Sequence, residues 1–460
     1  MFGALGLEIS KRVERIVPDP FVIAIGLTLL TAIIALLWGD FGDKNNVVAL
    51  LDSWRDGKSG MWKLLAFSMQ MCLVLVTGYA LATTNAVKSA IDSLADIPQN
   101  TASAAALVGA VACATGLLNW GLGLIVGALL AREVGFSMQR RNIPCHYPLI
   151  AAAGYMGLLV WHGGLSGSAP LSMTTLDNAA KVVPTQFLGQ YEPIVLSSSI
   201  GSTMNLFVSG GLLIGIPALL FLLAPRNKKD IRPIGGFGVD PGEAEKPSID
   251  PDSLPDRLNH STIIAWLLGV PLLLALGRHM VVSGVDRIGL NEITLFMLGA
   301  GLLLHGSPVG YMNAIANGAK GCAGIIIQFP LYAGIMAIMV ASGLMGTVTE
   351  FFVTMGSQET IPLLTMLSAG VVNLFVPSGG GQWAIQAPIA IESGLQSGVS
   401  QGTMVMAVAY GDQLTNMLQP FWALPLLAIT GVRARDIVGY TAIIMVAAGI
   451  WMGIGLLVFG

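Results

Sequence analysis

The fold of this chain is decided by one stretch, Asn373-Leu374-Phe375-Val376-Pro377-Ser378-Gly379-Gly380-Gly381-Gln382-Trp383. It interrupts a long apolar region with a proline, three consecutive glycines and several polar side chains. In the hydrocarbon of a membrane, broken backbone persists only where protein buries it or where it lines a wet cavity. Glycine also lets a ligand approach the main chain closely. We therefore expect the stretch to form the tip of a re-entrant helical hairpin at residues 359–394.

The composition indicates a membrane protein. Of the 460 residues, 54% are hydrophobic and only 11% are charged, whereas a soluble domain has about a quarter of its residues charged. Many apolar runs approach the roughly 18–20 residues that cross a bilayer as a helix. The sequence therefore predicts an all-α polytopic membrane protein in contact with lipid. The net charge of −3 is too small to indicate a nucleic-acid partner.

The apolar runs predict about nine transmembrane helices plus two re-entrant hairpins, each run being close to the length of a span. The two hairpins are expected at 102–134 and 359–394. The expected spans are 21–39, 62–83, 147–171, 194–224, 261–276, 293–305, 322–345, 403–427 and 437–459. Two of these spans are expected to break, at 161–170 before Pro170 and at 412–420 before Pro420, because proline removes a backbone donor and disfavours helix in the preceding residue.

The two halves of the chain show the same order of features, which predicts inverted repeats at 15–224 and 289–460, joined by a cytoplasmic linker and one helix at 225–288. An N-terminus in the cytoplasm and a C-terminus outside place most Lys and Arg residues inside, as the positive-inside rule requires. Paired interrupted segments at matching positions of two halves indicate a transporter binding site.

The candidate substrate site consists of the two tips and the two breaks. Helix N-termini at the tips would direct N–H groups and a positive dipole end towards a carboxylate. Alternatively, the tip glycines serve close helix packing, and the breaks are proline kinks capped locally. The candidate binding residues are Asn119, Trp120, Gly121, Gly123, His162, Ser166, Ser168, Ser378, Gly379, Gly380, Gly381, Gln382, Thr415, Asn416 and Gln419. Nearby tryptophans, Trp120, Trp161, Trp383 and Trp422, form either a wall for an acyl chain or ordinary membrane packing.

Two ionisable residues lie inside apolar spans, where such groups are functional by default. Asp412 is the candidate for the coupling ion, through Na⁺ binding or proton uptake, and a Na⁺ site is expected near Asn119, Asp412 and Asn416. His162 is expected to donate to the substrate, to relay a proton, or to be a structural histidine.

No Lys or Arg lies at either tip or break, which favours a small monoanion over a dianion. Signatures of an enzyme or of another cofactor are missing, and His162 with Ser166 is the sole conceivable catalytic pair.

Several segments resemble the short-chain fatty acid uptake (AtoE) family. The segments that carry the resemblance include Val17-Pro-Asp-Pro20, Asn119-Trp-Gly-Leu-Gly-Leu-Ile-Val-Gly-Ala128, Val376-Pro-Ser-Gly-Gly-Gly-Gln-Trp383 and Gln419-Pro-Phe-Trp-Ala-Leu-Pro425. The resemblance implies a secondary carrier, a symporter of short-chain fatty acids such as butyrate or acetoacetate, in the bacterial cytoplasmic (inner) membrane.

The resemblance also implies membership of the ion-transporter superfamily, with a homodimeric scaffold domain and a transport domain that moves as an elevator. Superfamily members with Ser-Asn-Thr at both tips bind Na⁺ there, but this chain has Asn119-Trp-Gly and Pro377-Ser-Gly-Gly instead. Coupling to H⁺ or to Na⁺ stays open. The alternatives are a transporter of another small carboxylate or dicarboxylate, an exporter, or a channel.

Overall fold

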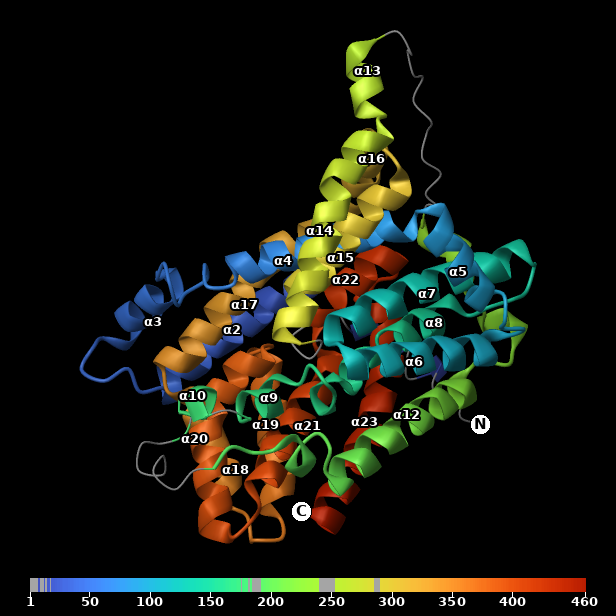
Figure 1. Cartoon of the computed structure of the whole chain (residues 1–460). Helices are drawn as coiled ribbons and strands as arrows, with labels where there is room; N and C mark the ends of the chain where they lie inside the picture. The colour runs from blue at the N-terminus through green and yellow to red at the C-terminus, as the bar shows by residue number, and fades with distance from the viewer. Residues whose placement is uncertain are drawn as a thin grey trace.

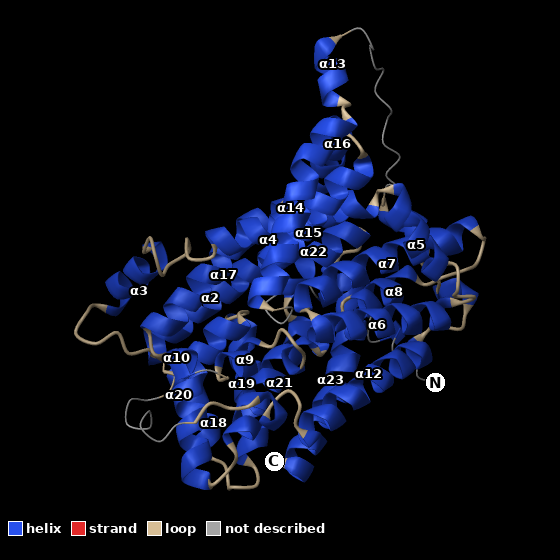
Figure 2. Ribbon diagram, in the orientation of Figure 1, coloured by secondary structure: helices blue, strands red, loops and turns tan. Residues whose placement is uncertain are grey.

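The structure is a computed structural model of the chain, and it describes all residues except 1–6, 9–11, 13–14, 17, 175, 181–182, 184–191, 240–252 and 285–289. The described residues form helices and loops without strands (Figure 2). The longer helices are α2 (Pro20–Trp38), α3 (Asn46–Arg55), α4 (Leu65–Ala82), α5 (Asn85–Ala95), α6 (Thr101–Leu118), α7 (Trp120–Arg140), α8 (Tyr147–Gly154), α12 (Thr203–Leu223), α14 (Thr262–Ser283), α15 (Leu290–His305), α16 (Pro308–Ala319), α17 (Ala323–Ala341), α18 (Leu344–Thr354), α19 (Ile361–Phe375), α20 (Gly379–Ser397), α21 (Gln401–Thr415), α22 (Pro420–Thr430) and α23 (Ala434–Phe459). Short helices are α9 (Ser168–Ser172), α10 (Leu176–Ala179) and α13 (Leu254–Asn259).

Among the described residues, seven helical segments are long and apolar enough to cross a membrane by length and composition. They are α2, α6, α7, α12, the stretch Leu254–Val282 that contains α14, α17 and α23. The prediction of an all-helical, polytopic membrane protein is therefore confirmed. The number of helices that cross the bilayer, and the re-entrant course of the hairpins, stay predictions.

Both predicted hairpins are helix pairs with a break at the expected tip. Hairpin 1 consists of α6 and α7, which meet at Asn119, and hairpin 2 consists of α19 and α20, which meet at residues 376–378. At the first tip Asn119 both ends α6 and starts α7, with an extended backbone. At the second, Ser378 is the N-cap of α20, as expected for a serine before a helix.

Some predicted boundaries are wrong. The span 322–345 ends at Ala341, because Gly343 adopts a left-handed backbone with φ of +68° and starts α18. The span 194–224 starts only at Thr203, where Ser202 caps α12 by accepting from the N–H of Asn205. The helix α16 was not predicted, although the Ser307-Pro308 pair at its start is a helix-start signal.

With these corrections, the helices follow the same order in both halves. The first half runs α2, α3, α4, α5, hairpin 1, a broken helix and α12, and the second runs α15, α16, α17, α18, hairpin 2, a broken helix and α23. The unpredicted helices α16 and α18 hold the places that α3 and α5 hold in the first half. This order is the one expected of two repeats, and the inverted orientation of the repeats stays a prediction. The predicted boundary between the linking helix and the second repeat, at 288/289, lies outside the described residues.

Two groups of helices meet around the hairpin tips (Figure 1). In one group α4 packs on α15 and α16, α17 packs on α2 and α3, and α14 packs on α15. In the other group α6 and α7 pack on each other and on α8, α12 packs on α6 and α23, and α19 packs on α21. Whether these groups are the predicted scaffold and transport domains stays a prediction.

Glycines bring hairpin 1 into backbone contact with the first broken helix. A Cβ on Gly116 would lie 2.5 Å from the carbonyl oxygen of Gly157, and one on Gly123 would lie 2.5 Å from Cα of Gly116. A Cβ on Gly154 would lie 2.5 Å from the carbonyl oxygen of Gly127. Any side chain here would force the backbones apart, so Gly123 serves close helix packing, and its predicted part in a binding site stays a prediction.

Candidate functional site

The site is built where two broken helices cross. After α8 the first helix passes through two short 3₁₀ turns, Met156–Leu159 and Trp161–Gly163, before α9. We call residues 155–167 the first break. The second break, residues 416–419, follows α21 and precedes α22. The hydroxyl of Tyr155 joins them by donating to the carbonyl oxygens of Asn416 at 2.9 Å and Gln419 at 3.2 Å.

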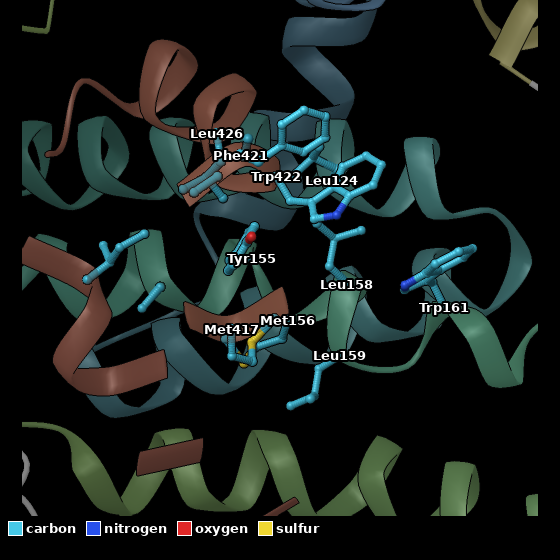
Figure 3. Packing of buried hydrophobic residues seen from close by; sticks show 14 of the residues in the cluster. Leu124, Tyr155, Met156, Leu158, Leu159, Trp161, Met417, Phe421, Trp422 and Leu426 are labelled. Atoms are coloured by element: carbon cyan, nitrogen blue, oxygen red, sulfur yellow. The ribbon is translucent and has the colours of Figure 1, made fainter. Parts of the chain in front are cut away.

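Both breaks differ from their predicted bounds. The first starts at Tyr155 rather than at 161, because the glycine contacts described above pull the backbone against hairpin 1. The second starts at Asn416 rather than at 412, so Asp412 is still helical. Pro420 is the first residue of α22, where the missing N–H costs no hydrogen bond. Apolar side chains of both breaks, including Met156, Leu158 and Met417, pack together and with Phe421 of α22 (Figure 3).

The tip of hairpin 1 has no free backbone donor at the start of its second helix. A helix leaves its first N–H groups without partners inside the helix. Here the N–H of Trp120 donates to Oγ of Ser166 at 2.9 Å. The side chain and the carbonyl of Asn119 accept, at 2.9–3.2 Å, from the next three N–H groups, those of Gly121, Leu122 and Gly123. The protein therefore satisfies this tip by itself.

The tip of hairpin 2 is open by comparison. Ser378 accepts the N–H of Gly381 on its Oγ at 3.2 Å and the N–H of Gln382 on its carbonyl at 2.7 Å. The first two N–H groups of α20, those of Gly379 and Gly380, find no acceptor among the described residues. Gly380 is exposed, and a Cβ there would meet only Cβ of Ser168, at 3.8 Å. Both donors are therefore left unused by the protein, and of the two residues Gly380 is accessible to a ligand whereas Gly379 is buried.

The first break lies against both tips. The N–H of Leu165 donates to the carbonyl of Leu117 at 2.7 Å and so caps the end of α6. On the other side, a Cβ on Gly379 would lie 2.7 Å from the ring of Trp161, 2.8 Å from Oγ of Ser168 and 3.0 Å from the ring of His162. The first break therefore lies between the two hairpin tips and contacts both. The indole Nε1 of Trp161 is buried and has no hydrogen-bond partner.

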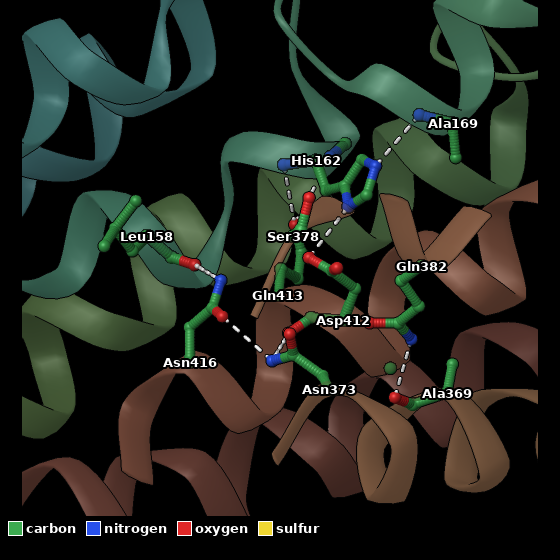
Figure 4. A network of polar contacts seen from close by, with 12 residues as sticks. Leu158, His162, Ala169, Ala369, Asn373, Ser378, Gln382, Asp412, Gln413 and Asn416 are labelled. Atoms are coloured by element: carbon green, nitrogen blue, oxygen red, sulfur yellow. Dashed lines mark hydrogen bonds and ion pairs between the residues drawn. The ribbon is translucent and has the colours of Figure 1, made fainter. Parts of the chain in front are cut away.

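His162 is fixed in one tautomer. The backbone N–H of Ala169 donates to its Nε2 at 3.0 Å, so Nε2 carries no proton. Its Nδ1 therefore carries the proton and donates to Oδ1 of Asp412 at 3.1 Å (Figure 4). His162 is 0% exposed. With both ring nitrogens engaged, His162 holds Asp412 in place and has no donor left for a substrate, which matches the structural role among its alternatives.

Hairpin 2 is tied to the second break by side-chain amides. Asn373 donates through Nδ2 to the carbonyl of Asp412 at 2.8 Å, to Oγ1 of Thr415 at 3.0 Å and to Oδ1 of Asn416 at 2.9 Å. Gln419 donates to the carbonyls of Asn373 at 3.2 Å and Leu374 at 2.9 Å, which caps the end of α19. Thr415, Asn416 and Gln419 therefore hold the hairpin in the structure seen here.

Gln382 faces away from the open tip. Its Nε2 donates to the carbonyl of Ala369 and to Oε1 of Gln386, both at 2.8 Å, and its Oε1 points towards Asp412 (Figure 4). The oxygen of Asn119, predicted for a Na⁺ site, is engaged by N–H groups, and that of Asn416 by Asn373. Of the three predicted Na⁺ ligands, Asp412 alone keeps a side-chain oxygen without a partner.

An aromatic cluster joins the first tip to α4 and α17. Trp120 lies 5.2 Å from Trp422 and 6.3 Å from both Trp161 and Phe67, measured between ring centroids. Phe67 in turn stacks on Phe329 of α17 at 5.8 Å. Trp383 packs elsewhere, in a cluster with Met173 and Met404. Three of the four tryptophans therefore form one aromatic cluster with two phenylalanines, and its role as a wall for an acyl chain stays a prediction.

Sequence reasoning missed Asn373 and Gln413 as site residues. The Oε1 of Gln413 accepts the N–H groups of His162 at 3.0 Å and Gly163 at 3.3 Å. Both are amide side chains inside apolar helices, which is a signal by which the sequence could have identified them. Within the described residues, no group of three or more His, Cys, Asp or Glu side chains could hold a metal ion.

Comparisons with known proteins place the chain among transporters. Residues 1–459 match the family described as short chain fatty acid transporter. A relative in Escherichia coli K12 is 38% identical over 100% of both chains, and one in Haemophilus influenzae is 37% identical over 97% of this chain and 98% of its own. Both relatives are provisionally named short-chain fatty acid transporters.

Two solved structures are similar over most of their length. The YdaH transporter of Alcanivorax borkumensis has a TM-score of 0.44 and 14% identity, with 95% of this chain and 98% of that chain covered. MtrF of Neisseria gonorrhoeae, whose class is described as antimetabolite efflux pumps, has a TM-score of 0.35 and 13% identity, with 98% and 96% covered.

Proposed function

The chain belongs to the short-chain fatty acid transporter family, and from that premise we propose that it is a secondary active symporter of small monocarboxylates such as butyrate or acetoacetate. Family membership confirms the prediction of a multi-pass membrane transporter rather than an enzyme, and it implies a carboxylate substrate. The ion that drives transport and the preferred substrate are parts of the proposal.

The open tip of hairpin 2 is the observation that carries the proposal. A carboxylate there would accept from the N–H groups of Gly379 and Gly380, at the positive end of the α20 dipole. The hydroxyl of Ser378 lies beside them, and the edge of the Trp161 ring, whose indole N–H has no partner, lies against Gly379. Neutral donors suit a monoanion, since no Lys or Arg occurs in either tip or break. The same absence disfavours a dicarboxylate.

The acyl chain would lie along the aromatic cluster. Trp161 belongs both to the open tip and to this cluster, because its ring lies 6.3 Å from that of Trp120. Trp120 and Phe67 are half-buried, so part of each ring is accessible. Trp120, Trp422 and Phe67 contact one another, so they would present one continuous aromatic surface to such a chain.

The remaining features of the proposal follow from sequence and resemblance. The protein acts in the bacterial inner membrane as a homodimer, with its N-terminus in the cytoplasm and its C-terminus outside. Hairpins 1 and 2 with the broken helices would move as one elevator body past α4 and α17. The aromatic contact of Trp120 with Phe67 is where such a body would slide, and aromatic faces without interlocking hydrogen bonds suit sliding.

Uptake into proteoliposomes tests the function. Purified protein is reconstituted, and entry of labelled butyrate is measured under an imposed pH step, an imposed Na⁺ step and neither. We expect accumulation with at least one gradient and competition by acetoacetate but not by succinate. No uptake under either gradient would overturn the proposal, stronger competition by succinate would favour a dicarboxylate carrier, and gradient-driven efflux alone would indicate an exporter.

A further inference from the structure

We propose that the cavity between hairpin 1 and the helices α4, α14 and α15 binds one acyl chain of a membrane phospholipid. The cavity has a volume of about 570 Å³, and residues of α4, α5, α6, α7, α14 and α15 line it. It therefore lies between the two groups of helices that meet around the hairpin tips (Figure 1). None of the described residues that line it belongs to hairpin 2 or to either break, so it is separate from the proposed carboxylate site.

The helix α7 has one face that protein covers and another that lines the cavity. On the covered face, a Cβ on Gly127 would collide with the carbonyl oxygen of Gly154. The cavity is lined by Leu122, Val126 and Leu129, among others. Residues spaced by three or four positions lie on one side of a helix. An apolar side of hairpin 1 therefore faces open space instead of another helix.

The lining of the cavity suits a hydrocarbon ligand. Among the described residues that form it, Glu292 is the one ionisable residue, and all the others are glycines or apolar residues. Such a cavity offers water no hydrogen-bond partners, so cavities of this kind stay dry and take up apolar ligands. Empty space is also unfavourable, because the atoms around it lose packing contacts.

The cavity is open to the lipid around the protein. Leu94 and Phe296 belong to its lining and are exposed, so it reaches the surface of the molecule. The helices α6, α7 and α14 that line it are among the segments that are long and apolar enough to cross a membrane. The solvent at such a surface is the hydrocarbon of the bilayer, and acyl chains are its main component.

The length of the cavity matches one acyl chain. The lining residues of α7 extend from Leu122 to Leu130, which is a length of about 12 Å at a rise of about 1.5 Å per residue. The hydrocarbon core of a bilayer is about 30 Å thick, so one leaflet contributes about 15 Å. The volume is also within the range of about 300–1,000 Å³ that is typical of ligand sites.

The charge of the lining favours a phospholipid over a free fatty acid. A phospholipid inserts its chain and leaves its head group at the membrane surface, whereas a fatty acid brings a carboxylate with it. Glu292 would repel a second carboxylate nearby. No Lys, Arg or His occurs among the described lining residues, and His279, whose Nε2 lies 4.0 Å from Oε1 of Glu292, is not part of the lining.

Photolabelling tests the site without any need for the substrate. Purified full-length protein in detergent receives increasing amounts of a phosphatidylethanolamine that carries a diazirine in one acyl chain, and it is irradiated, digested and analysed by mass spectrometry. We expect saturable labelling of residues 122–130, which unlabelled phosphatidylethanolamine displaces. Val126→Trp and Val111→Trp, which fill the cavity from α7 and from α6, should lose this labelling. Val446→Trp, the same change at an exposed position of α23, should keep it.

The Tm of each variant is measured alongside, and it should not fall, because filling a cavity commonly stabilises a protein. Absent or unsaturable labelling of 122–130 in the unmodified protein would overturn the site, and so would labelling that both cavity variants retain. Stronger labelling by an equimolar diazirine derivative of palmitic acid would assign the cavity to a free fatty acid and overturn the proposal. Displacement by butyrate would make this cavity a substrate site and also overturn it.

Discussion

Trp161→Phe is expected to weaken binding of the substrate carboxylate while leaving the fold intact. The substitution removes the indole N–H, which is buried and has no partner in the protein. It keeps an aromatic ring to stack on His162, where the centroids are 4.2 Å apart and the planes lie at 18°. A hydrogen bond to a charged group contributes about 1.5–3 kcal/mol, which corresponds to roughly a 10- to 150-fold rise in the half-saturating butyrate concentration.

The assay is initial uptake of labelled butyrate into proteoliposomes over a range of concentrations. Trp383→Phe is the matched control, because Trp383 also has a buried indole N–H without a partner but packs with Met173 and Met404 away from the open tip. We expect its half-saturating concentration to stay within about twofold of the unmodified protein. Equal effects of the two substitutions, or an unchanged concentration in Trp161→Phe, would refute the placement of the carboxylate.

Three further predictions, which use three substitutions and one chemical treatment, test the architecture. Gln419→Met removes both donors that cap α19, and leaving a buried carbonyl without a donor costs about 1–3 kcal/mol, so a lower Tm is expected and an unchanged Tm would contradict the cap. Gly164→Ala places a Cβ onto the backbone of Leu117, so it should lower Tm sharply. In Gly380→Ala the new Cβ makes only an ordinary contact, so Tm should stay unchanged while butyrate uptake falls. The reverse order of Tm values would be evidence against the packing. Burial raises the pKa of Cys145, in the loop between α7 and α8, to about 11, so little of this thiol is thiolate at pH 8 in the folded protein. Iodoacetamide should therefore label Cys145 far more slowly at pH 8 in the folded protein than after unfolding, as measured by mass spectrometry.

Local pattern was sufficient to locate both hairpin tips and both breaks approximately. Apolar runs, Pro420 and the glycine triplet at 379–381 are features of neighbouring residues, so their effect on the backbone can be read from the sequence. Boundaries failed where a distant contact decided them. The first break starts early because Gly157 lies against Gly116, about forty residues away along the chain, and no local signal of periodicity reports such a contact.

The sequence by itself determined the helical membrane class, the places where helices must break, the scarcity of charge at those places and the family. Tertiary structure alone decided which polar atoms are used. Asn119 and Ser378 look equivalent as tip residues, yet one tip closes on its own side chain and on Ser166, while the other keeps two N–H groups open. The physical reason is that a hydrogen bond needs a donor and an acceptor in contact, and only the folded chain decides which atoms meet. His162 and Asp412 are 250 residues apart, and only their contact decides which carboxylate oxygen of Asp412 keeps no hydrogen-bond partner.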